Sequence, residues 1–484
     1  FPYTTLFRSE CAVIGSDPAV ATRPGEILAG AEFYTYDDLS VELVDYVRDM
    51  GYTHIEVMPL MEHPFDGSWG YQTTGYYAAT SRYGNPQQLM HFIDACHEAG
   101  IGVIMDWVPG GFCADSHGLA TFNGHMLFEH EIHPNWGTHK FDFARGEVRS
   151  FLVSNVLYWL ENFHVDGIRM DGVSSMLYLN FGIDDPGQKK FNKYGTEEDL
   201  DASAFIRQVN CAVEAHFPDV MMMAEESTAW PLVTYPPQDG GLGFHYKWDM
   251  GWMNDTLDYF KKTSDERREN LGKLTFSMMY AWNEHYILPF SHDENVHGKA
   301  TIVQKMYGEY EGKFPQARAL YLYMAIHPGK MLDFMGNEFA QLREFDESRE
   351  QDWMVLKYPN HDDFHRYRRA LNEAYLANEA FWSREYDPEA FRWLDCAHPE
   401  LDACAIWRDG HDGAVLAAFN FGDTELADYT LTLPRAGKLT KLLDTDWQCF
   451  GGRTEKPKRL VGKACGGELK LTLAPFSGQL FKLV

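Results

Sequence analysis

Long hydrophobic runs are missing from this sequence of 484 residues, and its cysteines are few and scattered. No apolar stretch is long enough to cross a bilayer, which argues against a transmembrane protein. The eight cysteines match neither a metal-binding spacing nor a disulfide framework. We therefore expect a protein of the reducing cytoplasm.

Positive charge is also scarce, because 42 Lys and Arg residues stand against 71 Asp and Glu residues, for a formal net charge of −29. This excess of negative charge disfavours nucleic acid and anionic membrane surfaces as partners, whereas a neutral polymer is not repelled. Internal repeats and low-complexity tracts are absent as well. Aromatic residues, in contrast, make up 15% of the chain, which suits either sugar-stacking platforms or an aromatic-rich core.

An alternation of predicted helices and strands begins at Tyr36. The predicted helices cover 39–50, 86–99, 147–163, 202–216 and 317–326, and the predicted strands cover 54–60, 101–108, 165–170, 220–224, 287–290 and 331–335. Helices that alternate with apolar strands predict an α/β protein with a parallel sheet. The length of this region and the polar residues at its strand ends favour a (β/α)₈ TIM barrel over an open sheet.

The last part of the chain has a different pattern. Short β-rich segments separated by turn residues occur at 414–421, 429–433, 469–473 and 478–483. They predict a C-terminal antiparallel β-sandwich, so we divide the chain into a barrel at 10–378 and a β-sandwich domain at 379–484. Residues 1–9, FPYTTLFRS, match a translation of a sequencing-library adapter, and we expect them to be a non-native leader.

The stretch HVDGIRMDGVSSM, at 164–176, carries the clearest chemistry. Arg169 and Asp171 stand two positions apart at the end of a predicted strand, so both side chains point to the same face. An arginine fixed beside a carboxylate keeps that carboxylate ionised and oriented, as a glycosidic nucleophile requires. A structural ion pair at a strand end is the alternative interpretation.

Two other predicted strands deliver acids to the same end of the barrel. Asp106 shares a face with Ile104 and points into the barrel mouth, unless it only orders a loop. Glu225 and Glu226 follow the strand 220–224, and their alternate facing lets one of them reach the site. Glu225 follows three methionines and an alanine, and apolar surroundings raise the pKa of a carboxyl group and suit a general acid. An exposed acidic pair is the alternative.

A further strand delivers the letters SHDEN. His292 and Asp293 offer a donor and an acceptor that suit two neighbouring sugar hydroxyls. A metal site is the competing interpretation, but only His297 accompanies them at ligand spacing, so we expect no metal. Asp171, Glu225 and Asp293 thus stand at three strand ends, an arrangement that fits retaining glycoside chemistry.

Aromatic residues near these strand ends fit a sugar-binding groove, although each one alone is as easily a packing residue. The candidates are Trp69, Tyr71, Trp107, Trp136, Trp230, Trp248 and Trp252. Tyr71, in the loop FDGSWGYQ, is the strongest candidate for stacking on a sugar.

The motifs also carry a family resemblance. They are EHPFDGSWGYQ at 62–72, DWVPGGF at 106–112, DGIRMDGVSSM at 166–176, AEESTAW at 224–230, SHDENVHGK at 291–299 and GNEFAQ at 336–341. In them the chain resembles the 1,4-α-glucan (glycogen) branching enzymes of the α-amylase superfamily. The resemblance runs from Tyr34 to the end of the barrel and more loosely beyond it, and DGSWGYQ and AEEST point to branching enzymes rather than to amylases in general.

This resemblance implies a role for each motif residue. It implies Asp171 as nucleophile, Glu225 as general acid/base and Asp293 as the carboxylate that stabilises the transition state. Substrate binding is implied for Tyr71, Gln72, Asp106, Arg169 and His292. The implied reaction cleaves α-1,4-glucan chains and reattaches them through α-1,6 linkages without a cofactor, and we expect a monomer.

Two departures from the family pattern affect this expectation. The family's first motif reads DWVPGHF or DWVPAHF, and its His position is Gly111 here. Loss of one hydrogen bond to the sugar is worth roughly 1–3 kcal/mol, or up to about two decades in rate, so we expect a slowed enzyme. His117 is a candidate to supply the lost contact. The family's N-terminal β-sandwich is not found and the first barrel strand is poorly marked, which predicts lower stability and weaker binding of long glucans.

Two other functions stay open at this point. One is an α-glucan hydrolase on the same scaffold, which the linkage of the product would distinguish from a branching enzyme. The other is a catalytically impaired glucan-binding protein, which would bind without turnover. The fold alone does not separate these three functions.

Overall fold

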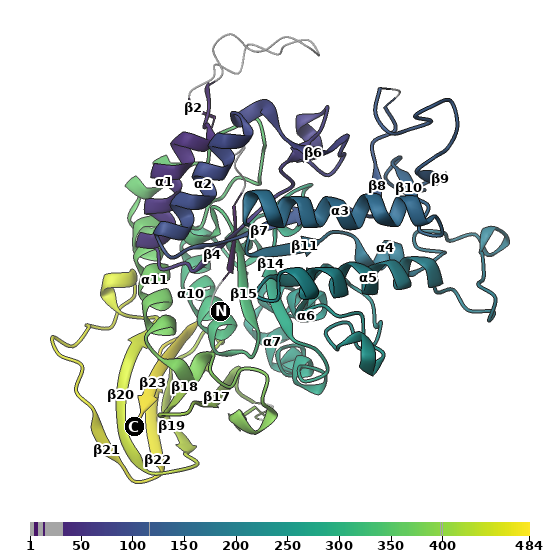
Figure 1. The fold of residues 1–484 in the computed structure, drawn as a ribbon. Coiled ribbons are helices and arrows are strands. Elements are labelled where there is room, and N and C mark those ends of the chain that lie inside the picture. The colour runs from purple at the N-terminus through teal and green to yellow at the C-terminus, as the bar shows by residue number, and fades with distance from the viewer. Residues whose placement is uncertain (1–3, 8–12, 15–31, 116, 397, 399) are drawn as a thin grey trace.

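The computed structural model describes residues 4–7, 13–14, 32–115, 117–396, 398 and 400–484. Its centre is a closed barrel of parallel strands in the spatial order β1-β15-β14-β13-β12-β11-β7-β4 (Figure 1). These strands are β1 (Thr4–Phe7), β4 (His54–Val57), β7 (Gly102–Trp107), β11 (Gly167–Met170), β12 (Met221–Ala224), β13 (Tyr246–Trp248), β14 (Tyr286–Phe290) and β15 (Lys330–Phe334). The predicted TIM barrel is therefore confirmed.

Helices surround this barrel. The longer ones are α1 (Tyr36–Asp49), α2 (Pro86–Glu98), α3 (Gly146–Phe163), α5 (Leu200–His216), α6 (Met250–Lys261), α10 (Tyr310–Ile326) and α11 (Pro359–Leu376), and the shorter ones are α4 (Val173–Leu177), α7 (Ser264–Asn270), α8 (Gly272–Thr275) and α9 (Ile302–Lys305). Capping boxes begin three of them, α1, α2 and α7, in which Thr35 and Asp38, Asn85 and Gln88, and Thr263 and Glu266 bond each other's backbone N–H groups. No helix among the described residues is both long and apolar enough to cross a membrane.

Strand β13 is one of the two barrel strands that the sequence did not predict, and β1 is the other. It has three residues, Tyr246–Trp248, and its middle residue is a lysine. Lys247 is buried because its ammonium group donates to Glu226 Oε2 at 2.6 Å, just after the neighbouring strand β12. From the sequence alone, a three-residue segment with a central lysine is interpreted as a loop, because the buried partner of that lysine, Glu226, cannot be identified.

The first barrel strand lies in the segment that we predicted as a leader. Thr4–Phe7 form β1, which pairs in parallel with β15 on one side and with β4 on the other and so closes the ring. This pairing does not bear on the origin of the codons, so the leader and the barrel boundary at residue 10 stay predictions. The other residues of the 1–9 segment lie outside the described residues.

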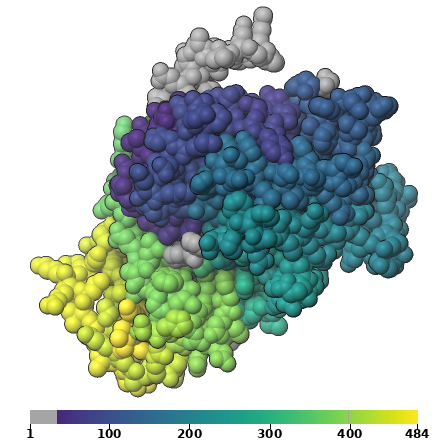
Figure 2. Space-filling model, viewed as in Figure 1, coloured from purple at the N-terminus to yellow at the C-terminus, as the bar shows by residue number. Residues whose placement is uncertain are grey.

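A C-terminal all-β domain follows the barrel. Its larger sheet has the order β16-β17-β18-β23-β20-β21, and β19 and β22 form a second sheet. The bounds are β16 (Phe391–Asp395), β17 (Ala403–Asp409), β18 (Ala414–Asn420), β19 (Leu426–Thr432), β20 (Gly437–Asp444), β21 (Lys463–Cys465), β22 (Glu468–Leu473) and β23 (Ser477–Leu483). Trp407 and Leu416 of one sheet share a core with Leu431 and Leu473 of the other, which confirms the predicted β-sandwich. Figure 2 shows this domain as the light-green to yellow lobe of the molecule.

Several short strands form small sheets outside the barrel. They are β8 (Gly111–Phe112), β9 (Glu129–Ile132) and β10 (His139–Phe141) in one antiparallel sheet, β5 (Met61–Glu62) with β6 (Gly75–Ala79), and β2 (Val13–Ile14) with β3 (Glu32–Phe33). The sheet β8-β10-β9 and the loop that precedes β6 both contribute residues to the pocket described next.

Candidate active site

A pocket of about 480 Å³ opens at the carboxyl ends of the barrel strands. Six of the eight residues that the sequence analysis singled out line it: Tyr71, Gln72, Asp171, Glu225, His292 and Asp293. The other two, Asp106 and Arg169, are each 1% exposed and lie directly behind these lining residues. Residues up to 222 positions apart, from Tyr71 to Asp293, thus meet in one cavity.

Arg169 connects the acids of this pocket. Its Nη1 lies 2.7 Å from Asp106 Oδ2 and 2.8 Å from Asp171 Oδ1. Its Nη2 lies 3.8 Å from Glu225 Oε2, which also accepts a hydrogen bond of 2.8 Å from the backbone N–H of Gly172. The register of the barrel explains the first contact, because Arg169 on β11 is the direct partner of Asp106 on β7.

Hydrogen bonds and ring stacking hold Tyr71 and His292 in place at the aromatic side of the pocket. The Tyr71 hydroxyl donates to Asp106 Oδ2 at 2.6 Å and lies 3.3 Å from His292 Nε2. The rings of Tyr71 and His292 stack with centroids 5.5 Å apart. His292 Nε2 also lies 3.4 Å from Asp293 Oδ1. Tyr71 therefore presents a fixed ring at the pocket, as a sugar platform requires.

Glu225 and Glu226 have different surroundings. Glu225 lines the pocket with a side chain that is 19% exposed. Glu226 is fully buried behind it, where it accepts from Lys247 Nζ at 2.6 Å and from the Ser174 hydroxyl at 3.0 Å. Of the two, Glu225 is the one placed to react with a ligand in the pocket.

Burial and neighbouring charges shift the pKa values of the three acids in the pocket in different directions. Burial raises the pKa of Glu225 to about 7 and also raises the pKa of Asp171 above its ordinary range, while Arg169 lowers both. Burial raises the pKa of Asp293 too, but the neighbouring His292 and Arg169 outweigh burial and hold that pKa below its ordinary value. Because Arg169 lies closer to Asp171 than to Glu225, the proton that the two acids share belongs on Glu225.

The sequence analysis missed His133. This residue lines the pocket, is 3% exposed, and stacks on Trp136 with ring centroids 3.9 Å apart. His133 Nδ1 accepts a hydrogen bond of 3.3 Å from the backbone N–H of Asn135, so the proton of the neutral ring lies on Nε2. Nε2 has no hydrogen-bond partner among the described residues and offers a donor to a ligand. The sequence signal that could have identified His133 was its position three residues before Trp136, in the letters HPNW, because Trp136 was already a candidate for the sugar-binding groove.

Of the seven aromatic candidates, three line the pocket, three including Trp248 are buried in the core, and Trp230 is partly buried outside the pocket. Trp69, Tyr71 and Trp136 line the pocket. Trp107 and Trp252 are fully buried, and Trp107 donates to Asn155 Oδ1 at 2.8 Å. Spacing along the chain could not separate these groups, because both kinds follow strand ends.

Gly111 lines the pocket from β8, where it pairs with Lys140 of β10. A Cβ atom at this position would lie 2.5 Å from the carbonyl oxygen of His139, so a side chain requires the strands to shift. His117, proposed from the sequence as a substitute, is exposed and is not among the residues that line the pocket. His133, in contrast to His117, does line the pocket.

A metal site was the alternative interpretation of the segment around His292. Among the described residues, no group of three or more His, Cys, Asp and Glu side chains has the arrangement to hold a metal ion. The polar atoms of the pocket bond one another instead, as Tyr71, Asp106 and Arg169 do.

Comparison with known structures identifies the fold. An alpha-amylase from Anoxybacillus superposes with a TM-score of 0.73 at 15% identity over 100% of this chain and 98% of that structure. An alpha-amylase from Geobacillus thermoleovorans, complexed with acarbose, gives a TM-score of 0.71 at 14% identity with the same coverage. The sequence also matches the family models for the alpha amylase catalytic domain at residues 40–126 and the alpha amylase C-terminal all-beta domain at residues 393–484.

Comparison with curated sequences is more specific. The 1,4-alpha-glucan branching enzyme GlgB of Thiobacillus denitrificans is 45% identical over 94% of this chain and 63% of the relative. The branching enzymes GlgB of Desulfitobacterium hafniense and Halothermothrix orenii are 47% and 46% identical over 93% and 89% of this chain, and over 70% and 69% of their own lengths. The chain thus spans about two thirds of the length of these relatives. By this similarity, which covers both of its domains, the chain belongs to the family of 1,4-alpha-glucan branching enzymes.

Proposed function

We propose that this chain is a transglycosidase that cleaves α-1,4-glucan chains and reattaches them through α-1,6 linkages. One observation carries the proposal: Arg169 lies between Asp171 and Glu225 in a single pocket, with separations of 2.8 Å and 3.8 Å. This arrangement gives one acid that is ionised and fixed and another that can hold a proton. Retaining glycosidases need that pair.

In the first step Asp171 attacks the anomeric carbon of the bound glucan. Glu225 donates its proton to the glycosidic oxygen as the α-1,4 bond breaks, and the chain with the new C4 hydroxyl leaves. The retained chain is then held as a β-linked ester of Asp171. Arg169 and Asp106 keep the Asp171 carboxylate in position, because Arg169 Nη1 contacts both.

In the second step the C6 hydroxyl of an acceptor chain attacks the same anomeric carbon. Glu225, now a carboxylate, takes the hydroxyl proton, and Asp171 leaves as a carboxylate. Two inversions give an α-1,6 linkage and restore both acids. His292 and His133 offer ring nitrogens to sugar hydroxyls, and Tyr71 offers its ring face.

The test is the linkage of the products made from amylose. Reducing ends are counted before and after treatment with a debranching enzyme. The proposal predicts a rise that appears only after debranching, and predicts none for Asp171→Asn. Asp184→Asn, an exposed acid outside the pocket, is the matched control and keeps full activity.

The same assay separates the alternatives. A rise in reducing ends before debranching means that water is the acceptor and that the chain is an α-glucan hydrolase. No rise in either measurement, together with retained glucan binding, means an impaired glucan-binding protein. We further propose that the chain acts on neutral α-1,4-glucan as a cytoplasmic monomer, and size-exclusion chromatography with light scattering tests the last point.

A further inference from the structure

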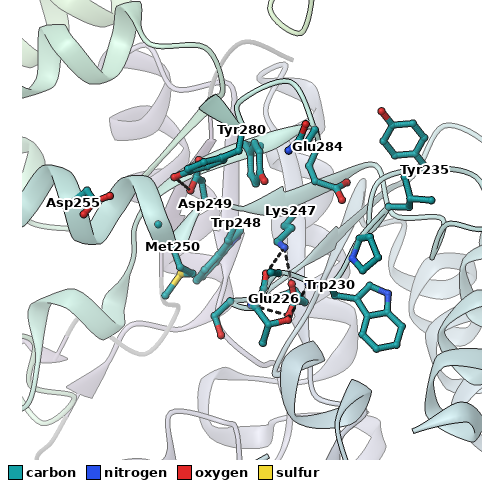
Figure 3. Close-up of a pocket in the computed structure, with 18 of the residues that line it drawn as sticks. Glu226, Trp230, Tyr235, Lys247, Trp248, Asp249, Met250, Asp255, Tyr280 and Glu284 are labelled. Carbon is teal, nitrogen blue, oxygen red and sulfur yellow. Dashed lines mark hydrogen bonds and ion pairs between the residues drawn. The ribbon is translucent and has the colours of Figure 1, made fainter. Parts of the chain in front are cut away.

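A second cavity, of about 630 Å³, lies beside the catalytic pocket. Its walls come from the segment after β12, from β13 with the start of α6, and from residues 276–286 (Figure 3). The two cavities meet at adjacent residues, because Glu225 lines the catalytic pocket and Glu226 lines the second one. Trp248 lines the second cavity, and the guanidinium of Arg169, which contacts the catalytic acids, lies 4.3 Å from the centre of its ring.

Two residues that line this cavity, Trp248 and Asp249, each have one buried side-chain atom without a hydrogen-bond partner among the described residues. Asp249 is 3% exposed, and its Oδ1 accepts from the backbone N–H of Trp252 at 2.8 Å and from the Tyr280 hydroxyl at 3.1 Å. Its Oδ2 has no hydrogen-bond partner among the described residues, and neither has Nε1 of Trp248. Buried polar atoms are normally paired, so an open acceptor and an open donor on two lining residues point to a ligand that has both kinds of group. Hydroxyl groups have both.

The other lining residues restrict the chemistry of this ligand. Lys247 is the one cation among the lining residues, and its ammonium group is already bound to Glu226 at 2.6 Å. The remaining charges are acidic, which excludes an anionic ligand. Trp230 and Phe276 contribute aromatic rings to the cavity lining. Phe276 is 56% exposed. Carboxylates and aromatic rings in one cavity suit a neutral sugar, which has hydroxyls at its edges and C–H groups on its faces.

The position of the cavity indicates which sugar chain it takes. Glu225 protonates the leaving oxygen and later deprotonates the attacking hydroxyl, so leaving chain and acceptor chain lie on its side of the anomeric carbon. The segment that forms the cavity wall begins at Glu226. Ser174, three residues after Asp171, fixes that wall by accepting from the backbone N–H of Ser227 at 2.8 Å.

We propose that the cavity formed by Trp230, Trp248, Asp249, Phe276 and Tyr280 binds the acceptor α-1,4-glucan chain. The proposal rests on the branching function proposed above. During transfer the acceptor's C6–O bond to the anomeric carbon forms as the ester bond to Asp171 breaks, and the hydroxyl proton moves to Glu225. Holding the acceptor beside Glu225 raises its local concentration over that of water and so favours transfer over hydrolysis.

The test compares two exposed residues of one turn, the 3₁₀ segment Phe276–Met279. Phe276 lines the cavity, whereas Met279, 79% exposed, is not among its lining residues. With amylose as substrate, Phe276→Ala lowers the ratio of new α-1,6 linkages to new reducing ends at least about fivefold, and Met279→Ala leaves it unchanged. Asp249→Asn, which keeps the Oδ1 acceptor for Trp252, lowers the ratio in the same direction. An unchanged ratio in both cavity variants, or an equal loss of both products, overturns the proposal.

A binding measurement keeps this test separate from that of the proposed function. Maltoheptaose is added to Asp171→Asn protein, and hydrogen exchange is followed in residues 276–286. The proposal predicts protection there that Phe276→Ala abolishes and Met279→Ala keeps. If the wild-type chain forms no branches, the branching function fails, while protection still decides whether the cavity binds glucan. Protection confined to the catalytic pocket overturns the inference.

Discussion

Arg169 contacts acids of different strength, and the distances decide which of them carries a proton. Coulomb attraction falls with distance, so its contact of 2.8 Å holds Asp171 ionised more firmly than its contact of 3.8 Å holds Glu225. The same guanidinium lies against the ring of Trp248, which limits its freedom to move. The division of labour between the two acids therefore follows from one buried side chain.

The pH dependence of the reaction tests this division. The general acid is active only while protonated, and the pKa of Glu225 is raised to about 7, chiefly by burial. We expect kcat/KM to fall as the pH rises through about 7. Glu225→Gln should lower the rate by about 10²–10⁴-fold and remove this fall. A fall near pH 7 that persists in Glu225→Gln would assign the titration to another group.

Gly111 gives a second prediction for a single residue. A Cβ atom there meets the His139 carbonyl oxygen at 2.5 Å, so we expect Gly111→Ala to destabilise the fold by about 1–3 kcal/mol. Gly146→Ala, where nothing lies within 4 Å, is the matched control and should leave stability equal or slightly higher. Urea unfolding followed by tryptophan fluorescence measures both. Equal stability of the two variants would show that β8 and β10 accommodate a side chain readily.

Neighbouring barrel strands are joined by buried charges as well as by backbone hydrogen bonds. Strands β12 and β13 share two residue pairs, Met223 with Tyr246 and Ala224 with Lys247. Lys247 adds an ammonium contact of 2.6 Å to Glu226 and one of 2.9 Å to the Thr228 carbonyl oxygen. Both residues of this pair also line the second cavity.

Breaking the pair should cost far more than a surface ion pair would. Lys247→Met leaves the Glu226 carboxylate buried without its cation, and we expect a loss of about 3–5 kcal/mol in the free energy of unfolding. The double variant with Glu226→Gln removes the charge and should recover part of that loss. Denaturant unfolding of the three proteins gives the comparison. A loss below that of an exposed pair would mean that water reaches Glu226.

Long apolar elements were predictable from sequence, and short polar ones were not. The predicted strand 220–224 and helix 202–216 lie within two residues of β12 and α5, because their hydrophobic pattern alone defines them. Strand β13 was missed because its buried lysine depends on a partner 21 positions away. His133 was missed because only the fold places it in one pocket with the distant residues Asp171 and Glu225. What the sequence could not supply is pairing between distant segments.

The C-terminal domain is bound to the barrel through buried arginines. Arg318 on α10 donates to the Thr445 carbonyl oxygen at 2.7 Å. Arg408 on β17 donates to the carbonyl oxygen of Ile326 at the end of α10 at 3.0 Å. Contacts to charged donors in a buried interface are strong, so barrel and β-sandwich should unfold together.

This coupling predicts a difference between two arginines. Arg318→Met removes a buried charged donor, and we expect a loss of about 1.5–3 kcal/mol. Arg366→Met, at an exposed position that pairs with Asp362, should change stability by about 1 kcal/mol or less. Calorimetry measures both, and limited proteolysis reports whether the domains separate. Release of an intact β-sandwich from the wild-type chain at low denaturant would contradict the coupling.

The central claim is that Asp171 forms a covalent bond to the glucan while Glu225 moves the protons. Mass spectrometry of the Glu225→Gln protein treated with α-maltosyl fluoride tests it most directly, because fluoride leaves without acid help and the missing base slows the second step. The account predicts one maltosyl group on the peptide that contains Asp171, and none when Asp171→Asn is added. A maltosyl group on another acid, or turnover without any adduct in both proteins, would contradict the account.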